Sequence, residues 1–310
     1  MTHNPQNDFN EEHSFTNAID HLILMHRECH FGGHFPTMID YYEKEGKGVS
    51  EDFSLEDINR LAMLEAQMQQ NLAALLLTGP EMEKVAQSRD LYKKLRSLYE
   101  TESSATKIPR LIADLILSER ESEEQDIQAV ADQKHAVVPA LIDLLRSEDF
   151  HDPLFPGYGL APALAAKCLG LVGDKRAIIS LFESIGEMDV FDEEITLKAL
   201  KSIGEPAKEF LMRILKGRPL TYDTERTAIA LVSFKDDEDV AQTCLKMLQE
   251  KDILSNLSLA PYLILTCEGL KDPAQQKDFK ELLNHPALSK ELALDIRAVI
   301  HSWGNQSKHS

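Results

Sequence analysis

Positive charge is scarce in this sequence. Its 310 residues include 33 lysines and arginines against 52 aspartates and glutamates, which gives a formal net charge of -19 at pH 7. Binding to nucleic acid depends on basic side chains that displace counterions from the phosphates, so a chain with this charge repels a phosphate backbone. The composition argues against nucleic acid and against anionic membrane surfaces as partners of the whole chain.

Cysteines are few, and long apolar runs are missing. Cys29, Cys168, Cys244 and Cys267 are far apart in the sequence, and three of them fall within helical apolar patterns, where a free thiol behaves as a small hydrophobic side chain. No segment approaches the roughly 18 apolar residues of a membrane-spanning helix, and the polar first residues do not read as a secretory leader. We expect a soluble, cytoplasmic protein without disulfide bonds.

Catalytic motifs are missing as well. Serine, histidine and aspartate residues are scattered and form no nucleophile-elbow pattern. The acidic runs lack the glycine spacing of a calcium-binding loop. Gly32 and Gly33 are more typical of a tight turn than of a phosphate-binding loop, because no strand is predicted before them. These absences favour a protein that is not an enzyme and that binds no cofactor.

Apolar residues recur at helical spacing through most of the chain, in which 43% of the residues are hydrophobic. We therefore expect an all-α protein. Order should begin near Ser14, after a disordered tail at residues 1–13. An N-terminal helical bundle is expected at 14–103 and further helices at 108–303, followed by a second tail at 304–310.

Two features of the N-terminal region predict particular helices. Ser54 is a candidate N-cap for a long helix that continues to about residue 78. Gly79-Pro80 then ends that helix and begins the next one. Because the connection is so short, we expect these two helices to pack as an antiparallel hairpin.

Residues 163–215 contain a repeated pattern. The sequence ALAAKCLGLVGDKRAI is followed about 30 residues later by EEITLKALKSIGEPAKEFL, a period typical of stacked helical repeats. Each copy predicts two amphipathic helices joined by a polar turn, at Gly173-Asp174 and at Gly204-Glu205, and weaker copies follow near Lys235 and Leu270. We expect the acidic residue after each turn to stabilise the start of the second helix.

These repeats, at about residues 136–301, resemble HEAT repeats of the short PBS-lyase type. The resemblance implies an α-α superhelix built from degenerate helical hairpins. The arginine that this family often carries on the first helix is replaced by Ala165, Thr196 and Thr227. One HEAT-like enzyme, deoxyhypusine hydroxylase, binds two irons through His-Glu dipeptides, and no histidine here is followed by glutamate. A tetrapyrrole lyase-like activity remains an alternative that the resemblance implies.

The stretch HLILMHRECHFGGHF contains the densest group of candidate metal ligands. His26 and His30 are four residues apart and share one helical face, as a metal site would require, whereas Cys29 points about 100° away from His30. We expect these histidines to pack and to hydrogen-bond where the first helix turns into the second. A metal-dependent or ligand-modifying enzyme with its site at His26 and His30 remains the alternative.

One long connection, at residues 148–160, is rich in proline, glycine and aromatic residues. These residues exclude a regular helix. Loops of this length are either packed down by their own aromatic side chains or available to a partner. We favour the packed-down arrangement.

The predicted function is that of a protein-protein interaction scaffold or adaptor. Acidic turns repeated along a solenoid fall on one edge, where they can meet a basic segment of a partner protein. Neither nucleic acid nor membrane insertion is expected. The candidate partner-binding residues are Asp192, Glu193, Glu194, Asp236, Asp237, Glu238 and Asp239.

Overall fold

The protein is all-α, as the sequence predicts. The computed structural model describes residues 17–100, 104–186, 190–250 and 252–306, and within these ranges the regular structure is helical, with no strand. Every helix among them is too short or too polar to cross a lipid bilayer. The tail expected at 1–13 and Ser14, where order was expected to begin, lie outside the described residues.

The contacts divide the chain into two compact units that are not contiguous in sequence. Unit 1 comprises the described residues up to Asp126 together with Ser147–Pro162, and unit 2 comprises Ile127–Arg146 together with the described residues from Ala163 onward. The boundary between the ranges expected at 14–103 and 108–303 falls within unit 1, because the first segment of this unit extends to Asp126.

Helices of unit 1 are α1 (Ala18–His30), α2 (Phe35–Glu43), α3 (Leu55–Met68), α4 (Leu72–Leu76), α5 (Gly79–Ser97) and α6 (Lys107–Leu117). The helices α7 (Glu123–Ala131) and α9 (Ala161–Val172) pass from one unit into the other. Unit 2 continues with α8 (Val138–Leu145), α10 (Ile178–Ser184), α11 (Val190–Ile203), α12 (Glu205–Leu215), α13 (Tyr222–Val232), α14 (Glu238–Leu248), α15 (Ala260–Thr266), α16 (Pro273–Glu281) and α17 (Lys290–Gln306).

Side-chain caps define several of the helix starts of unit 1. The Asn17 side chain accepts a hydrogen bond from the Asp20 amide at the start of α1, and the Ser54 hydroxyl accepts one from the Asp57 amide at the start of α3, as predicted. The apolar faces of α1, α2 and α3 meet in one core, whose fully buried members include Ile23, Leu24, Met38, Ile58 and Leu61.

The prediction of one long helix from Ser54 to residue 78 is wrong, because this segment forms two helices, α3 and α4. Gln69 adopts a left-handed conformation with φ 53°, which ends α3, and the Asn71 side chain accepts a hydrogen bond from the Ala74 amide to start α4. The prediction that this helix packs against the next one, α5, as an antiparallel hairpin is also wrong. Helix α5 packs against α1, because the break turns the chain before α5 begins.

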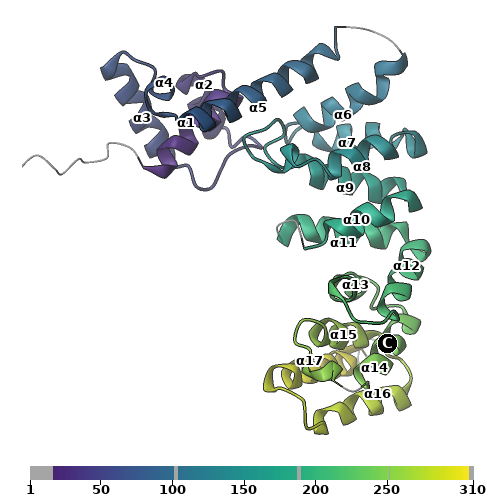
Figure 1. Cartoon of the computed structure of the whole chain (residues 1–310). Helices are drawn as coiled ribbons and strands as arrows, with labels where there is room; N and C mark the ends of the chain where they lie inside the picture. Colours follow the sequence, from purple (N-terminus) through teal and green to yellow (C-terminus); the bar gives the residue numbers. More distant parts are fainter. Residues whose placement is uncertain (1–16, 101–103, 187–189, 251, 307–310) are drawn as a thin grey trace, which may run out of the picture. The chain divides into compact units, whose positions relative to one another are not determined.

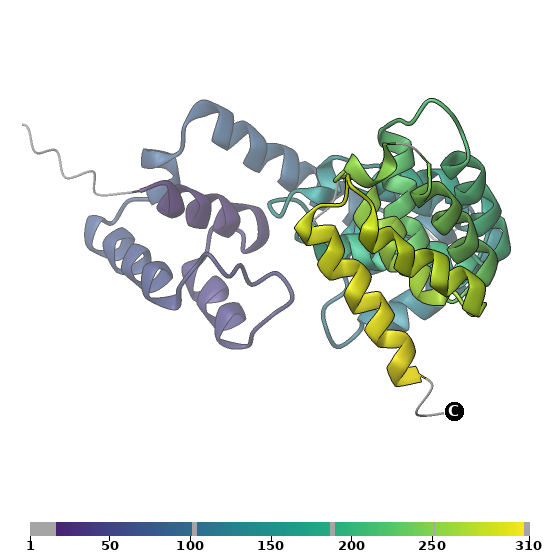
Figure 2. The ribbon, with the colours of Figure 1, turned by 90° about the horizontal axis from the view of Figure 1, so that it is seen from below.

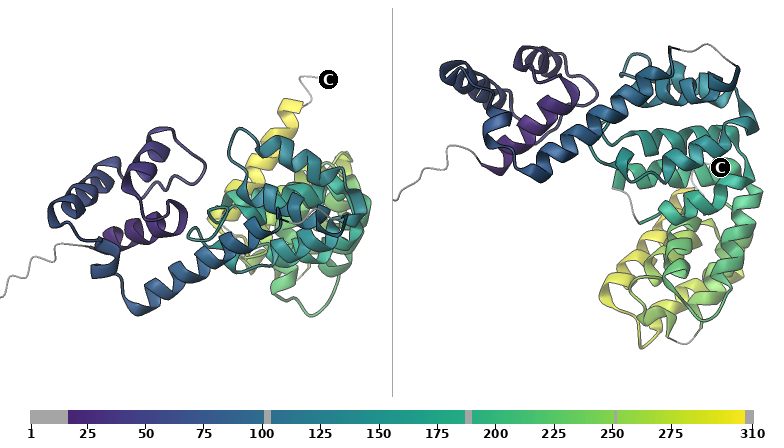
Figure 3. Two further views of the ribbon diagram at one scale, coloured as in Figure 1. Left: turned by 90° about the horizontal axis from the view of Figure 1, so that it is seen from above. Right: turned by 45° about the horizontal axis from the view of Figure 1, so that its top comes forward.

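Unit 2 consists of helices packed in sequence-adjacent pairs. Helix α10 contacts α11, α12 contacts α13, and α14 contacts α15, while α13, α15 and α17 pack in succession. In Figure 1 these three helices follow one another on one side of the unit, with α12, α14 and α16 beside them, and Figure 3 shows the same pairs turned. Seen from below in Figure 2, the helices of unit 2 overlap along the stack. This sequential pairing is the arrangement expected of an α-α superhelix.

The acidic turn residues cap the helices that follow them, as predicted. Asp174, Asp237 and Asp272 each accept a hydrogen bond from the amide two residues further on. The turn at Gly204 differs, because the N-cap position is held by a glycine with φ 79° and Glu205 is the first residue of α12. Most of the polar turns therefore specify their own helix starts.

Ion pairs connect consecutive turns of unit 2. The Asp174 carboxylate contacts the His135 ring, the Lys208 ammonium lies 2.6 Å from Asp237, and Lys235 pairs with Glu268. Each of these ion pairs therefore links two segments of unit 2 that are well separated in the sequence.

Two other features of unit 2 concern close packing and the chain end. A Cβ atom on Gly170 of α9 would lie 2.8 Å from Ala199 Cα of α11, so the backbones of these helices approach closely. Helix α17 continues to Gln306, so residues 304–306, which were expected in the tail, are helical. Residues 307–310 lie outside the described part of the chain.

Candidate functional site

A groove of about 380 Å³ lies between α13 and α15 in unit 2. We call it the α13–α15 groove. Helix α13 and the segment that leads into α15 form its walls, and Ile185 and Gly186, which follow α10, lie at one end. Its lining residues are Ile185, Gly186, Tyr222, Glu225, Arg226, Ile229, Leu257, Ser258, Pro261 and Tyr262.

The wall on α13 follows from helical spacing. Tyr222, Arg226 and Ile229 recur at intervals of four and three residues and so share one face of the helix. The other side of α13 buries Ala228 and Leu231 in the core of unit 2. Helix α13 therefore has one face in the core and one face along the groove.

Tyr222 is exposed yet held in place. Its side chain is 56% exposed, but the Arg226 guanidinium carbon lies 4.7 Å from its ring centroid. On another side its hydroxyl lies only 2.6 Å from the position that a Cβ atom would occupy on Gly186. Arg226 also lies over the Phe182 ring, at 5.6 Å from the centroid. A large aromatic side chain with few remaining rotamers loses little entropy when a partner covers it.

Apolar surface extends from Tyr222 across the groove. Leu257 is 58% exposed in the facing wall. Leu265, which is 40% exposed, follows Pro261 and Tyr262 by one helical turn of α15 and lies on the same face. Large exposed apolar side chains that surround a hollow are typical of a surface that binds another molecule.

Carboxylates gather at the end of the groove where α13 begins. Glu193 accepts a hydrogen bond from the Gly186 amide at 3.3 Å, and Glu225 lines the groove without an ion pair to any described residue. The exposed Asp223 lies 3.6 Å from the Arg226 guanidinium. Neither Glu193 nor Glu225 has an ion-pair partner among the described residues, so this end of the groove carries negative charge.

The structure divides the candidate partner-binding residues between two places. Glu193 lies at the groove, whereas Glu194 pairs with Lys198 one turn along α11 at 2.7 Å. The side chain of Asp192 lies outside what the structure describes. This first group is at the end of α13 that carries Tyr222.

The second group, Asp236–Asp239, lies at the opposite end of α13. Asp237 caps α14 and contacts Lys208, which holds the pKa of the Asp237 carboxyl below its ordinary value. Glu238 accepts a hydrogen bond from Gln242 at 3.3 Å, and Asp236 and Asp239 are exposed. The two predicted acidic groups therefore do not form one site.

His30 packs and hydrogen-bonds in unit 1, as expected, whereas His26 packs against neighbouring rings and its buried Nε2 atom has no hydrogen-bond partner among the described residues. Their ring centroids are 4.6 Å apart. The His30 Nε2 atom donates to the Pro153 carbonyl at 2.9 Å, and its Nδ1 atom accepts from the Tyr92 hydroxyl at 2.7 Å. Burial lowers the pKa of His30 to about 4 and that of His26 well below its ordinary value.

Cys29 points into a separate apolar cluster, as helical geometry predicts. Its neighbours there are Met25, Val85, Leu154 and Phe155. Burial raises the pKa of the Cys29 thiol to about 11. In the part of the chain that the structure describes, no group of three or more histidine, cysteine, aspartate and glutamate side chains is placed to hold a metal ion.

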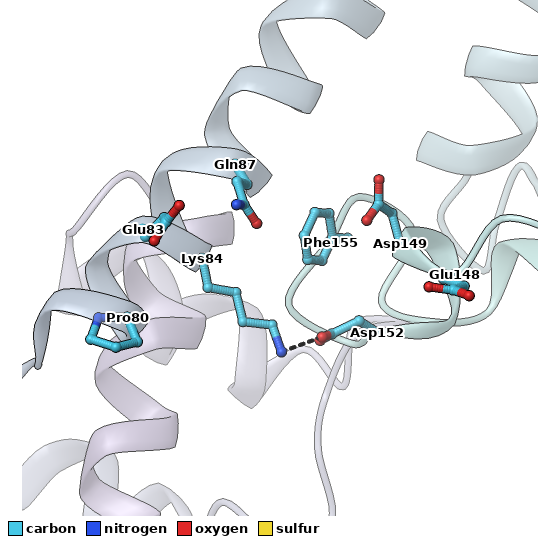
Figure 4. Close-up of a pocket in the computed structure, with 8 residues that line it drawn as sticks. All are labelled: Pro80, Glu83, Lys84, Gln87, Glu148, Asp149, Asp152 and Phe155. Atoms are coloured by element: carbon cyan, nitrogen blue, oxygen red, sulfur yellow. Dashed lines mark ion pairs between the residues drawn. The ribbon is translucent and has the colours of Figure 1, made fainter.

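The connection at 148–160 is packed down on unit 1, as predicted. Leu154 and Phe155 are buried against α1 and α5, and the Ser88 hydroxyl donates to the Leu154 carbonyl at 2.6 Å. A second pocket of about 380 Å³ lies where this connection meets α5. Figure 4 shows Lys84 reaching across it to pair with Asp152, with Phe155 in the wall and acidic side chains around the opening.

Comparison with known proteins gives no indication of function, so a proposal has to rest on the fold and on these surfaces. No protein-family model matches the sequence, and no curated protein matches it significantly.

Sequence reasoning missed the groove. The α13 residues that line it follow the helical period of a buried face, and the chain gives no separate signal that α15 leaves part of this face open. The only local hint is that an arginine, Arg226, interrupts an otherwise apolar stripe.

Proposed function

We propose that this protein is a non-enzymatic scaffold or adaptor that binds a segment of another protein in the α13–α15 groove. The observation that carries the proposal is Tyr222, an exposed aromatic side chain fixed between Arg226 and Gly186 at the edge of a groove. Tyrosine and arginine are enriched among the few residues that supply most of the binding energy of protein interfaces.

The packing of unit 2 supports the same proposal. Helices paired in sequence present a row of parallel helix faces, and grooves between such faces hold extended or helical segments of partner proteins. A groove of about 380 Å³ has room for a few side chains of such a segment. The acidic turn at 236–239 contributes less, because Asp237 is already engaged by Lys208 and by the start of α14.

Site-specific photo-crosslinking in the native cell tests this function. A photoreactive amino acid at Leu257 should yield a discrete protein adduct, and the same group at Lys246, an exposed position on α14, should not. The Leu257 adduct should disappear in a chain that also carries Tyr222→Ala and whose helical content is unchanged by circular dichroism. Equal labelling from both positions, or an adduct that survives Tyr222→Ala, would contradict the proposal.

A further inference from the structure

The charges and the apolar surface of the α13–α15 groove together define the kind of partner that fits it. We infer that the groove accepts a short protein segment that places a large apolar side chain beside a lysine or arginine. This inference rests on the proposed function and specifies the ligand of the same site.

The apolar side chain of the ligand fits between the apolar walls of the groove. Leu257 and Tyr262 form one wall of the groove and Ile229 the other, and Tyr222 stands at its edge. Covering Tyr222 and Leu257, which are 56% and 58% exposed, removes apolar area from water and so favours binding. An aliphatic or aromatic side chain between these walls is the occupant that gains this area without leaving a buried polar group unpaired.

The acidic end of the groove, where α13 begins, favours a basic side chain on the ligand. Glu193 is anchored there by the Gly186 amide, and Glu225 lies one helical turn from Tyr222. Asp223 and Glu225 suit the first turn of α13, where acidic side chains complement the helix dipole. That role leaves the Glu225 carboxylate free to accept hydrogen bonds from a ligand, and no described residue forms an ion pair with it.

Neither Glu193 nor Glu225 forms an ion pair with a described residue, whereas the Arg226 guanidinium stacks on Tyr222 and Phe182 and lies 3.6 Å from Asp223. An acidic ligand would therefore meet the surplus carboxylates, whereas a lysine or arginine would pair with one of them. Charge complementarity of this kind selects among partners and increases the association rate.

Spacing sets the length of the segment. The groove face of α13 extends from Tyr222 to Ile229, which corresponds to about 10 Å along a helix. A helical segment covers that distance with about seven residues and an extended segment with about three. The basic and apolar side chains of the ligand should therefore be close in sequence.

Selection from a library of random twelve-residue peptides displayed on phage, with the full-length protein as bait, tests the inference. Enriched peptides should combine leucine, isoleucine, phenylalanine or methionine with a lysine or arginine at a fixed spacing. The best peptide is then synthesised with a fluorescent label, and its Kd is measured by fluorescence anisotropy. Glu225→Gln should weaken its binding about tenfold, and Tyr222→Ala at least as much.

The matched control is Glu209→Gln, which removes an exposed carboxylate from α12 away from the groove. It should leave Kd within twofold. If Glu209→Gln weakens binding as much as Glu225→Gln does, the attraction reflects only the net charge of the chain, and the inference is wrong. A charge exchange is the second arm: Glu225→Lys should lose the basic peptide and bind a peptide in which glutamate replaces the basic residue.

The outcomes separate this inference from the function on which it rests. Peptides that need Tyr222 but contain no basic residue, or that ignore Glu225→Lys, overturn the inference and keep the groove as a binding site. Failure to enrich any peptide that depends on Tyr222, together with the absence of a Leu257 adduct, overturns both.

Discussion

His30 donates a hydrogen bond from Nε2 to the carbonyl of Pro153 across 2.9 Å, although the two residues are 123 positions apart in the chain. This bond connects the first helix to a connection that contains no α-helix, only the short 3-10 helix Asp149–His151. Because a carbonyl can only accept, Nε2 carries a proton, and in the neutral imidazole that burial favours, Nδ1 accepts from the Tyr92 hydroxyl.

The stability of the protein should therefore depend on pH between about 6.5 and 4. The unfolded chain protonates these histidines below their ordinary pKa of about 6.5, whereas burial keeps His30 neutral in the folded protein until about pH 4. The folded state binds fewer protons in this range, so the free energy of unfolding falls as the pH is lowered. His30 alone should account for about 1–2 kcal/mol between pH 7 and pH 5.

Urea denaturation of the full chain at both pH values measures this loss. His30→Gln should be less stable at pH 7 and should flatten the dependence above pH 5. The carboxyl groups whose pKa values are lowered, such as that of Asp237, lose their contribution only at still lower pH, as their ordinary pKa values are approached. An unchanged slope in His30→Gln would show that His30 is not the group that titrates.

Gly186→Ala should destabilise unit 2 and displace Tyr222. Gly186 has φ 82°, which disfavours any other residue, and the added methyl group would meet the Tyr222 hydroxyl at 2.6 Å. The matched control is Gly173→Ala, where φ is 67° and no atom lies near the added methyl group. Gly186→Ala should cost about 1 kcal/mol more than the control, and adding Tyr222→Phe should recover part of that difference in urea denaturation. Equal costs and no recovery would contradict the contact.

Ion pairs of unit 2 should contribute more to the free energy of unfolding when their side chains are less exposed. Lys208, whose side chain is 15% exposed, contacts Asp237, whereas Lys198 and Glu194 form a pair whose side chains are 72% and 63% exposed. Lys208→Met should cost about 1 kcal/mol and Lys198→Met close to zero. Asp237→Ala should cost about 1–2 kcal/mol, because it also removes the cap of α14. Thermal unfolding at low and high salt compares the three variants, and a larger loss in Lys198→Met than in Lys208→Met would contradict the ranking.

Gly170→Ala should be strongly destabilising even though alanine is the better helix former. The new Cβ would lie 2.8 Å from the Ala199 Cα atom, so α9 and α11 must move apart, at a cost of about 1–3 kcal/mol. Gly304→Ala, a helical position in α17 with open space around its Cβ site, should instead be neutral or slightly stabilising. Calorimetry of both variants checks the contrast, and similar melting temperatures would show that the helices tolerate a wider separation.

Much of the fold is predictable because its signals are local. Four helix caps form through contacts between residues at most three positions apart, and such contacts can be recognised from the sequence alone: Ser54, Asp174, Asp237 and Asp272. The fate of the 148–160 connection also followed from its composition, because aromatic residues such as Phe155 gain more from burial than from exposure.

The remaining features depend on neighbours that are distant in sequence. The break at Gln69 falls inside an unbroken helical period, and the Glu65 carboxylate helps to fix it by accepting from the Leu72 amide. Tyr222 lies on an apolar stripe like those of the core, and only the position of α15 leaves it exposed. Periodicity identifies a face of a helix but not what covers it, so the groove could not be predicted.

The return of residues 147–162 to unit 1 has a consequence for how the chain can be cut or made. Leu154 and Phe155 fill the space beside Met25, Cys29 and Val85, so a fragment that stops at Asp126 would leave these three side chains facing water. During synthesis, α1 and α5 leave the ribosome well before the residues that complete their core, and they have to wait for the chain to reach Pro162. Neither unit can therefore be obtained by a single truncation of the gene.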